Sequence, residues 1–411
     1  LRFSWGLTGN NRIGEYDYYQ LLSVLKSRIG SYTATNSIPS GVYPFENDAT
    51  NAGTVPISLQ NKNLKWETTE QWNLGVDLSF FDERIGLTMD IYRKNTRDLL
   101  LAAQLPYSSG FYNATKNIGK VRNDGLEISL NTLNIKTRDF QWSSNFNISF
   151  NKNKVLALSE NQTALLTAVQ FDQNYNGQSS YIAKIGLPMG LMYGYVYEGT
   201  YKYDDFNKSG NSYSLKSSVP HFSTENNTQP GMPKYADLNG DGVVDSNDRT
   251  IIGRGLPVHT GGLTNDFTYK GIDLGVVLSA RVGGLAYSAT QGILDYYGVS
   301  ETSATARDNG GIPINNGKVN AQKYYQTIGT GEGGYGRYYL YSATNVRLQE
   351  LSLNYTLPRK WFKNVANVTL GVVGRNLWMI YCKAPFDPEL SASTSLSLIH
   401  ISEPTRLGMI S

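Results

Sequence analysis

The sequence is poor in cysteine, histidine and charge. Its one cysteine, Cys382, excludes an internal disulfide framework and a thiolate metal cluster. There are only 3 histidines, and no Ser–His–Asp set carries a nucleophile-elbow sequence. Lys and Arg total 37 against 34 Asp and Glu, so the net charge of +3 lacks the basic footprint of a nucleic-acid-binding protein. We therefore expect neither an enzyme nor a partner of nucleic acid.

Long apolar runs are absent as well. No stretch of about 18 consecutive apolar residues occurs, so no segment has the composition of a membrane-spanning helix. The absence of such a run does not exclude the strands of a membrane barrel, because only every second residue of such a strand is apolar. Gly (41), Tyr (29) and aromatic residues in general (12%) are plentiful instead. Tyr and Trp suit the aromatic girdles at the two edges of a membrane barrel.

Residues 66–92 carry the most informative pattern, a strict alternation of apolar and polar side chains. The apolar positions are Trp72, Leu74, Val76, Leu78, Phe80, Ile85, Leu87, Met89 and Ile91, with polar residues such as Asn73, Asp77, Thr88 and Asp90 between them. Successive side chains of a strand point to opposite faces, so each strand has one apolar and one hydrophilic face. The apolar face belongs either in lipid, with the polar face lining a lumen, or in the core of a soluble sandwich.

The alternation recurs along the chain and predicts about ten long strands. We place them at 2–9, 65–81, 84–99, 122–134, 140–152, 260–269, 272–288, 341–357 and 366–381, with a weaker one near 190–203. Short turns join the hairpins, and long polar segments join one hairpin to the next, at roughly 10–64, 101–121, 153–257 and 289–340. Short turns on one side and long loops on the other are typical of membrane barrels. The predicted fold class is all-β, a partial antiparallel transmembrane β-barrel.

The weaker strand near 190–203 poses a topological question. If all short turns lie on one side, an even number of membrane crossings must separate strand 140–152 from strand 260–269. The weaker strand supplies one crossing, so it either pairs with an unrecognised partner or belongs to an extracellular insertion at about 153–257. The sequence leaves both alternatives open.

Several motifs occur in a fixed order. They are Leu7-Thr8-Gly9-Asn10 with Ile13-Gly14, Asn63-Leu64-Lys65-Trp66-Glu67-Thr68-Thr69, Asn117 to Glu127, Tyr235 to Gly242 with Asp248 to Gly253, and Gly374-Arg375-Asn376-Leu377-Trp378 with Phe386-Asp387-Pro388-Glu389. With these motifs residues 1–392 resemble the SusC/RagA-like TonB-dependent transporters of the outer membrane.

The resemblance implies a 22-stranded barrel around a plug, of which residues 1–392 are the C-terminal part with long extracellular loops. It implies import of a bulky nutrient, an oligosaccharide or a peptide, across the outer membrane. It also implies a SusD-like surface lipoprotein as a lid and coupling to the TonB complex through an N-terminal part that this chain lacks. The final strand of the family is expected to be missing too. Residues 396–411 read as translated sequencing adapter, an artefact tail.

Two other classes of function stay open at this point. A soluble or surface-anchored all-β carbohydrate-binding module would bury the apolar strand faces against a second sheet instead of exposing them to lipid. An enzyme would need a convergent acid/base or nucleophile cluster, which the sequence does not show.

Residues 237–248 fit the calcium-loop template D-x-[DN]-x-[DN]-G with an acid at position twelve. The predicted ligands are side chains of Asp237, Asn239, Asp241, Asp245 and Asp248 and the backbone carbonyl of Val243. Position twelve is Asp instead of the usual Glu, which shortens the capping side chain. Hard oxygen donors without His or Cys favour Ca²⁺ over Zn²⁺. The sequence thus predicts a structural calcium site, with a metal-free acidic turn as the alternative.

Overall fold

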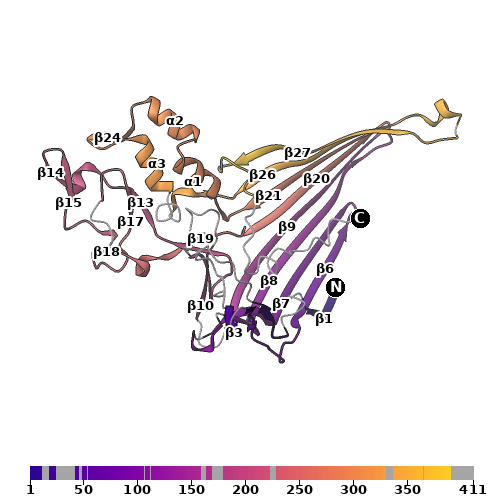
Figure 1. Cartoon of the computed structure of the whole chain (residues 1–411). Coiled ribbons are helices and arrows are strands. Elements are labelled where there is room, and N and C mark those ends of the chain that lie inside the picture. Colours follow the sequence, from indigo (N-terminus) through magenta and orange to yellow (C-terminus); the bar gives the residue numbers. More distant parts are fainter. Residues whose placement is uncertain are drawn as a thin grey trace.

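A curved, twisted antiparallel sheet of nine long strands dominates the chain (Figure 1). The computed structural model describes residues 1–11, 18–24, 42–45, 49–52, 54–105, 107–111, 113–158, 163–168, 179–222, 228–329, 337–363 and 365–389. The strands are β1 (Arg2–Asn10), β6 (Glu67–Phe80), β7 (Ile85–Gln104), β8 (Asn113–Lys136), β9 (Phe140–Ala157), β20 (His259–Tyr269), β21 (Ile272–Val282), β26 (Asn345–Thr356) and β27 (Thr369–Cys382). They pair in chain order, which leaves β1 and β27 at the two edges.

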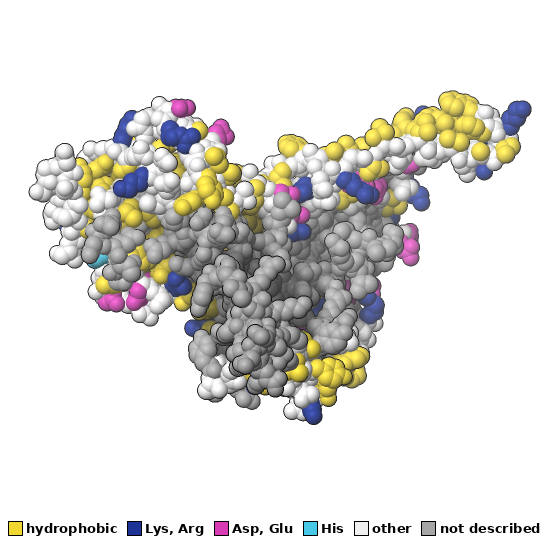
Figure 2. Space-filling model, viewed as in Figure 1, with side chains coloured by type: hydrophobic (Ala, Val, Ile, Leu, Met, Phe, Trp, Pro, Cys, Tyr) yellow, Lys and Arg dark blue, Asp and Glu magenta, His cyan; other side chains and the backbone are white. Residues whose placement is uncertain are grey.

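One face of this sheet is apolar across many strands. The register aligns alternate residues into rows, one of which reads Leu78, Leu87, Leu130, Phe146, Leu263 and Leu278. Side chains on this face are not buried in a core: Leu78 is 41% exposed, Ile91 59% and Val372 75%. The hydrophobic side chains that gather on the projecting end of the sheet are visible in Figure 2. An apolar face of this extent is suited to contact with lipid chains.

The opposite face is hydrophilic. The row adjacent to the leucine row reads Asp77, Thr88, Ser129, Asn147, Gly262 and Ser279. On this face the Arg2 guanidinium contacts two carboxylates, Asp77 through Nε at 2.7 Å and Asp90 through Nη2 at 3.2 Å. In a barrel this face lines the lumen, so we refer to it as the lumen face.

The short turns owe their geometry to residues in the left-handed region. Phe81, Asp82 and Glu83 between β6 and β7 have φ of 57°, 51° and 62°. Lys270 and Gly271 between β20 and β21 have φ of 49° and 87°, as a two-residue type I′ hairpin requires. All four short turns lie at one end of the sheet, and the helices lie at the other (Figure 1). The short-turn end is the periplasmic end in barrels of this kind.

The remaining elements lie in the long connections. The short strands are β2 (Leu22–Val24), β3 (Val42–Phe45), β4 (Ala49–Ala52), β5 (Thr54–Pro56), β10 (Ala164–Ala168), β11 (Ser179–Lys184), β12 (Leu191–Gly194), β13 (Tyr197–Thr200), β14 (Phe206–Ser209), β15 (Ser212–Leu215), β16 (His221–Phe222), β17 (Pro233–Tyr235), β18 (Val243–Val244), β19 (Thr250–Arg254), β22 (Leu285–Tyr287), β23 (Ile312–Ile314), β24 (Gly317–Val319) and β25 (Leu340–Ser342). The helices are α1 (Ala289–Tyr296), α2 (Glu301–Asp308) and α3 (Ala321–Gly329). No helix in the described part of the chain is long and apolar enough to span a membrane.

Residues 179–222, 228–254, 285–329 and 337–342 pack beside one another at the long-loop end of the sheet, and we name them the loop body (Figure 1). Its helices begin at serine caps: the side chains of Ser288 and Ser300 accept the backbone N–H of Gln291 and Ser303, both at 3.1 Å. These caps satisfy amides that the first helical turn leaves without partners.

The predicted all-β barrel fold is confirmed, and nine of the ten predicted strands belong to the sheet. The tenth, near 190–203, does not. It forms β12 and β13, which pair with β11, β19 and β17 inside the insertion. Because β9 pairs directly with β20, no crossing separates them, and the topological question is resolved in favour of the insertion.

Several predicted boundaries were wrong. The segment 101–121, predicted as a loop, is largely strand, because β7 runs to Gln104 and β8 starts at Asn113. Strand 272–288 ends early, at Val282, because Gly283 and Gly284 follow with φ of 83° and 86°. The tail 396–411 lies outside the described residues.

The two faces predict opposite responses to the same substitution. Met89 lies on the apolar face and Thr88, its neighbour on β7, on the lumen face. We expect Met89→Arg in the full-length protein to lower the free energy of unfolding from lipid by about 2–4 kcal/mol, because the guanidinium would lie in hydrocarbon. Thr88→Arg, beside Asp77, should cost less than about 1 kcal/mol. Urea titration of refolding into liposomes measures both, and equal losses would contradict the assignment of faces.

Candidate functional site

One buried carboxylate holds the extracellular ends of β1, β6 and β7 together. Glu67 is 4% exposed and lies directly opposite Asn10. Its Oε2 accepts a hydrogen bond from Asn10 Nδ2 at 2.8 Å, and its Oε1 accepts the backbone N–H of Leu100 at 2.9 Å. Leu100 follows a bulge in β7, where Asp98 has φ of 57°. The carboxylate thereby satisfies an amide at an irregular point of the ladder.

Asn117 on β8 forms hydrogen bonds at the same extracellular end of the sheet, to the segment before β6 and to the bulge in β7. Its Oδ1 accepts the backbone N–H of Lys65 at 2.8 Å, and its Nδ2 donates to the carbonyls of Lys65 at 2.7 Å and Asp98 at 2.8 Å. Three sequence motifs, those containing Asn10, Glu67 and Asn117, thus meet at one rim of the sheet. Their role is to position the long connections that leave this rim.

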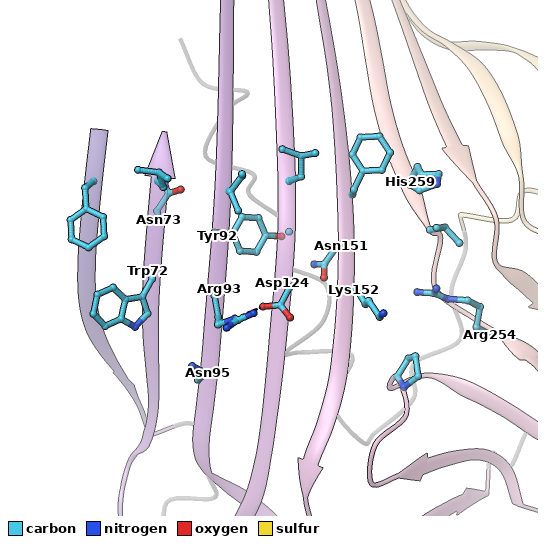
Figure 3. Close-up of a pocket in the computed structure, with 18 residues that line it drawn as sticks. Trp72, Asn73, Tyr92, Arg93, Asn95, Asp124, Asn151, Lys152, Arg254 and His259 are labelled. Carbon is cyan, nitrogen blue, oxygen red and sulfur yellow. Dashed lines mark hydrogen bonds and ion pairs between the residues drawn. The ribbon is translucent and has the colours of Figure 1, made fainter. Parts of the chain in front are cut away.

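A close contact between Tyr92 and Gly125 shapes the lumen face below that rim. The tyrosine ring is 8% exposed and lies over the glycine, so a Cβ at position 125 would come within 2.2 Å of the ring Cζ. No other residue fits at position 125 without moving the ring. A hollow of about 910 Å³ lies where the sheet meets the loop body, and its lining includes Tyr92, Asn151, Pro188 and Arg254 (Figure 3).

Arg347 on β26 forms a comparable set of contacts near the opposite edge of the sheet. Its side chain is 9% exposed, and its Nη2 donates to Asp387 Oδ1 at 2.6 Å while Nη1 donates to Asn376 Oδ1 at 3.3 Å. The hydrogen bond from Arg347 holds the pKa of Asp387 below its usual range. The stabilisation from this pair is therefore present above the ordinary Asp pKa and lost as the pH falls through the lowered value. Glu389, two residues on, pairs with Arg281 at 3.4 Å.

The loop body is one packed unit made from two separate connections. Side-chain amides of Asn315 and Asn316 donate to the Asp204 carboxylate, the latter at 3.0 Å. The Tyr203 hydroxyl donates to the Lys318 carbonyl at 3.0 Å. These contacts join the connection between β9 and β20 to the connection between β21 and β26.

A cluster of tyrosines also joins these two connections. Tyr197 and Tyr338 meet edge to face with ring centroids 5.5 Å apart. Asp295, 1% exposed, accepts hydrogen bonds from Tyr339 Oη at 2.9 Å and Gln291 Nε2 at 3.0 Å. Burial raises the pKa of Tyr197 and Tyr338 above the ordinary phenol value.

The acidic loop at residues 237–248 is folded tightly on itself. Gly240 and Gly242 have φ of 78° and 86°, which only glycine adopts without strain. Side-chain oxygens accept backbone N–H groups from Gly240 and Gly242 to Asp237, from Asp241 to Asn239, from Val243 to Asp241 and from Asn247 to Asp245, at 2.7–3.0 Å. Asp248 is fully buried and accepts the N–H groups of Leu238 at 2.8 Å and Asp245 at 2.8 Å.

The six predicted calcium ligands are thus gathered in one loop. Among the described residues, no group of three or more His, Cys, Asp or Glu side chains is placed to hold a metal ion. The carboxylates instead shape the loop through its own amides. The calcium site stays a prediction, and the donor chemistry of the loop, all oxygen, is the kind that Ca²⁺ prefers.

The sequence alone did not reveal the contacts that bring these residues together. The motifs containing Glu67, Asn117 and Asp387 were recognised, but their meeting points depend on register across strands far apart in the chain. Arg347 carried no signal of its own, because its partner lies 40 residues away. The contact of Tyr92 with Gly125 likewise depends on the register between β7 and β8.

The buried position of Glu67 leads to a prediction. We expect Glu67→Ala in the full-length protein to lower the free energy of unfolding by about 1–3 kcal/mol, because Asn10 and the Leu100 amide would lose their acceptor in a buried site. The matched control is Glu70→Ala on the same strand, whose carboxylate accepts Trp5 Nε1 at 3.1 Å on the exposed outward face. Its loss should stay below about 1 kcal/mol. Denaturant midpoints in detergent compare the two, and an equal loss would refute the role of Glu67.

The architecture matches known proteins. The family model described as "TonB dependent receptor-like, beta-barrel" matches residues 2–377. The chain is 32% identical over 391 residues to TonB-dependent receptor P3 of Formosa agariphila, covering 94% of this chain and 35% of that protein. It is 27% identical to TonB-dependent receptor SusC of Bacteroides thetaiotaomicron, over 95% of this chain and 35% of that protein.

A solved structure shares the fold. The structure of the RagAB peptide transporter superposes with a TM-score of 0.66 at 22% identity, over 94% of this chain and 38% of the matched chain. This chain therefore spans about a third of the length of these relatives. Since the family match extends over most of the sequence, the chain belongs to the TonB-dependent receptor-like β-barrel family of the outer membrane, with a barrel of the SusC/RagA type.

Proposed function

We propose that the full-length protein containing this barrel segment imports a bulky nutrient, an oligosaccharide or a peptide, across the outer membrane with energy supplied through TonB. The observation that carries the proposal is the continuous hydrophilic lumen face whose extracellular end leads into the loop body. The hollow of about 910 Å³ where this face meets the loop body leaves room for a large solute. One relative of this fold is named as a peptide transporter.

The surface of the loop body supports the proposal that a SusD-like lipoprotein is a partner of this protein. The loop body is a packed, hydrogen-bonded unit at the extracellular end of the sheet, and it presents exposed apolar side chains such as Tyr297 (57%) and Val299 (68%). A SusD-like surface lipoprotein that closes over the mouth would cover such groups.

The other candidate functions have less support. A soluble carbohydrate-binding module needs a second sheet over the apolar face, whereas that face is exposed along β6, β7 and β27. The proposed function is transport without covalent chemistry, so no residue here is assigned a catalytic role.

Uptake in cells tests the transport proposal. Cells with the parent gene, a gene deletion or a TonB deletion would receive fluorescent oligosaccharides and peptides too large for porins. We expect uptake of one class by the parent alone, and surface binding without uptake in the TonB deletion. A small porin-permeable solute is the control and should enter all three strains equally. Unchanged uptake in either deletion would contradict the proposal.

We also propose that residues 237–248 bind a structural Ca²⁺ through Asp237, Asn239, Asp241, Val243, Asp245 and Asp248. The support is the spacing of oxygen donors and the turned backbone that Gly240 and Gly242 allow. A bound ion would neutralise four carboxylates and fix the loop against the buried Val244, which is 1% exposed in its tyrosine cluster.

Calorimetry with CaCl₂ on the full-length protein tests this site. Asp241→Ala should weaken calcium binding at least about tenfold, since it removes a charged ligand. The control Glu198→Gln removes a charge from the exposed edge of β13, elsewhere in the loop body, and should leave binding unchanged. A parent protein that shows no calcium binding, or an Asp241→Ala protein that binds normally, would mean that these residues form an acidic turn only.

A further inference from the structure

The outward face of β7, β8 and β9 changes character abruptly at one level. Below it, Ile91, Leu126 and Phe150 form an apolar row across the three strands. The next outward row reads Arg93, Asp124 and Lys152. The three strands continue well past this level, since they have 20, 24 and 18 residues, against 11 in β20.

The rows above the apolar band are strongly basic. After Arg93, Asp124 and Lys152 comes the row Asn95, Arg122 and Lys154, and then Arg97 opposite Lys120. We name six side chains the basic patch: Arg93, Arg97, Lys120, Arg122, Lys152 and Lys154. Asp124 is the one carboxylate that the register places among them. Figure 3 shows Arg93, Asp124 and Lys152 side by side on neighbouring strands.

The single carboxylate is already engaged. Asp124 lies 2.6 Å from Arg93 and 3.1 Å from Arg122. Within the described residues, no acidic side chain forms an ion pair with Arg97, Lys120, Lys152 or Lys154. Four cations on three adjacent strands are therefore left for an external anion.

Without a bound anion, the like charges that the register places directly opposite each other would destabilise this part of the sheet. Arg97 lies directly opposite Lys120, and Arg122 directly opposite Lys154. Like charges at directly opposed positions destabilise a sheet. Phosphate groups between the strands would convert these repulsions into charge-assisted hydrogen bonds.

The level of the patch identifies the anion. Trp5 and Trp72 continue the row of Arg93 on β1 and β6, and tryptophan marks the boundary between hydrocarbon and headgroups. From Trp72 to Phe80 the alternating apolar positions of β6 span nine residues, a length with which a tilted strand of an outer-membrane barrel crosses the hydrocarbon region. Since the short turns are periplasmic, the basic patch lies at the outer leaflet.

We propose that the basic patch docks a phosphorylated glycolipid of the outer leaflet, with lipid A phosphates on the cations and its acyl chains on the apolar rows of Ile91, Leu126 and Phe150. The inference rests on the outer-membrane orientation but not on the transported substrate. A soluble acidic protein is a less suitable occupant, because the apolar rows continue directly below the patch into the membrane.

Binding of purified lipid A by the full-length protein in detergent tests this proposal, with native mass spectrometry or calorimetry as the readout. The patch variant carries Arg97→Gln, Lys120→Gln and Lys154→Gln. The charge-matched control carries Lys270→Gln, Lys360→Gln and Lys363→Gln in the periplasmic turns. We expect the patch variant to bind lipid A about 10- to 100-fold more weakly and the control to bind like the parent.

Two further arms separate the possible ligands. Dephosphorylated lipid A should bind the parent as weakly as lipid A binds the patch variant, and inorganic phosphate should not compete at equal concentration. Normal lipid A binding by the patch variant would overturn the proposal. So would equal affinity of the parent for both lipids, or loss of an acidic co-purifying protein without any change in lipid A binding.

Discussion

Every backbone amide and carbonyl of a membrane-spanning strand needs a partner within the protein, because hydrocarbon offers none. For the seven interior strands of this sheet the neighbouring strands supply those partners, and the pairing fixes which side chains share a face. A shift of one residue would turn the row Leu78, Leu87 and Leu130 inward and the row Asp77, Thr88 and Ser129 outward. The lumen, the lipid face and the position of every loop therefore depend on this register.

Side-chain hydrogen bonds reinforce the register at the extracellular rim, where the loops leave the sheet. Glu67 and Asn117 bind backbone groups beside a bulge in β7, and Arg347 ties β26 to the segment after β27. These contacts hold the roots of the connections that pack together as the loop body. The outward side of the same rim carries the basic patch, so in our proposals the two faces of β7–β9 serve the solute path and the outer leaflet respectively.

Much of the fold was predictable because period-two alternation is a local property. Trp72 to Phe80 and Phe140 to Phe150 show it plainly, and both lie in strands of the sheet. The segment near 190–203 could not be placed from the sequence because its strands β12 and β13 have four residues each, too few for a pattern that distinguishes a membrane crossing from a packed insertion. The contacts of Glu67, Arg347 and Asp204 could not be predicted, because each joins segments whose proximity follows from register and loop packing. The calcium loop, a local motif, was identified by its spacing and stays a prediction.

The assignment of faces is tested most directly by oxygen accessibility along β9 in a lipid bilayer. Replacing Cys382 by serine leaves a background without other cysteines in this part of the protein, so single spin-labelled cysteines can be placed at positions 145 to 150 of the full-length protein. The structure predicts high accessibility to oxygen at 146, 148 and 150 and low accessibility at 145, 147 and 149. A profile without this two-residue period, or with the opposite phase, would contradict the barrel described here.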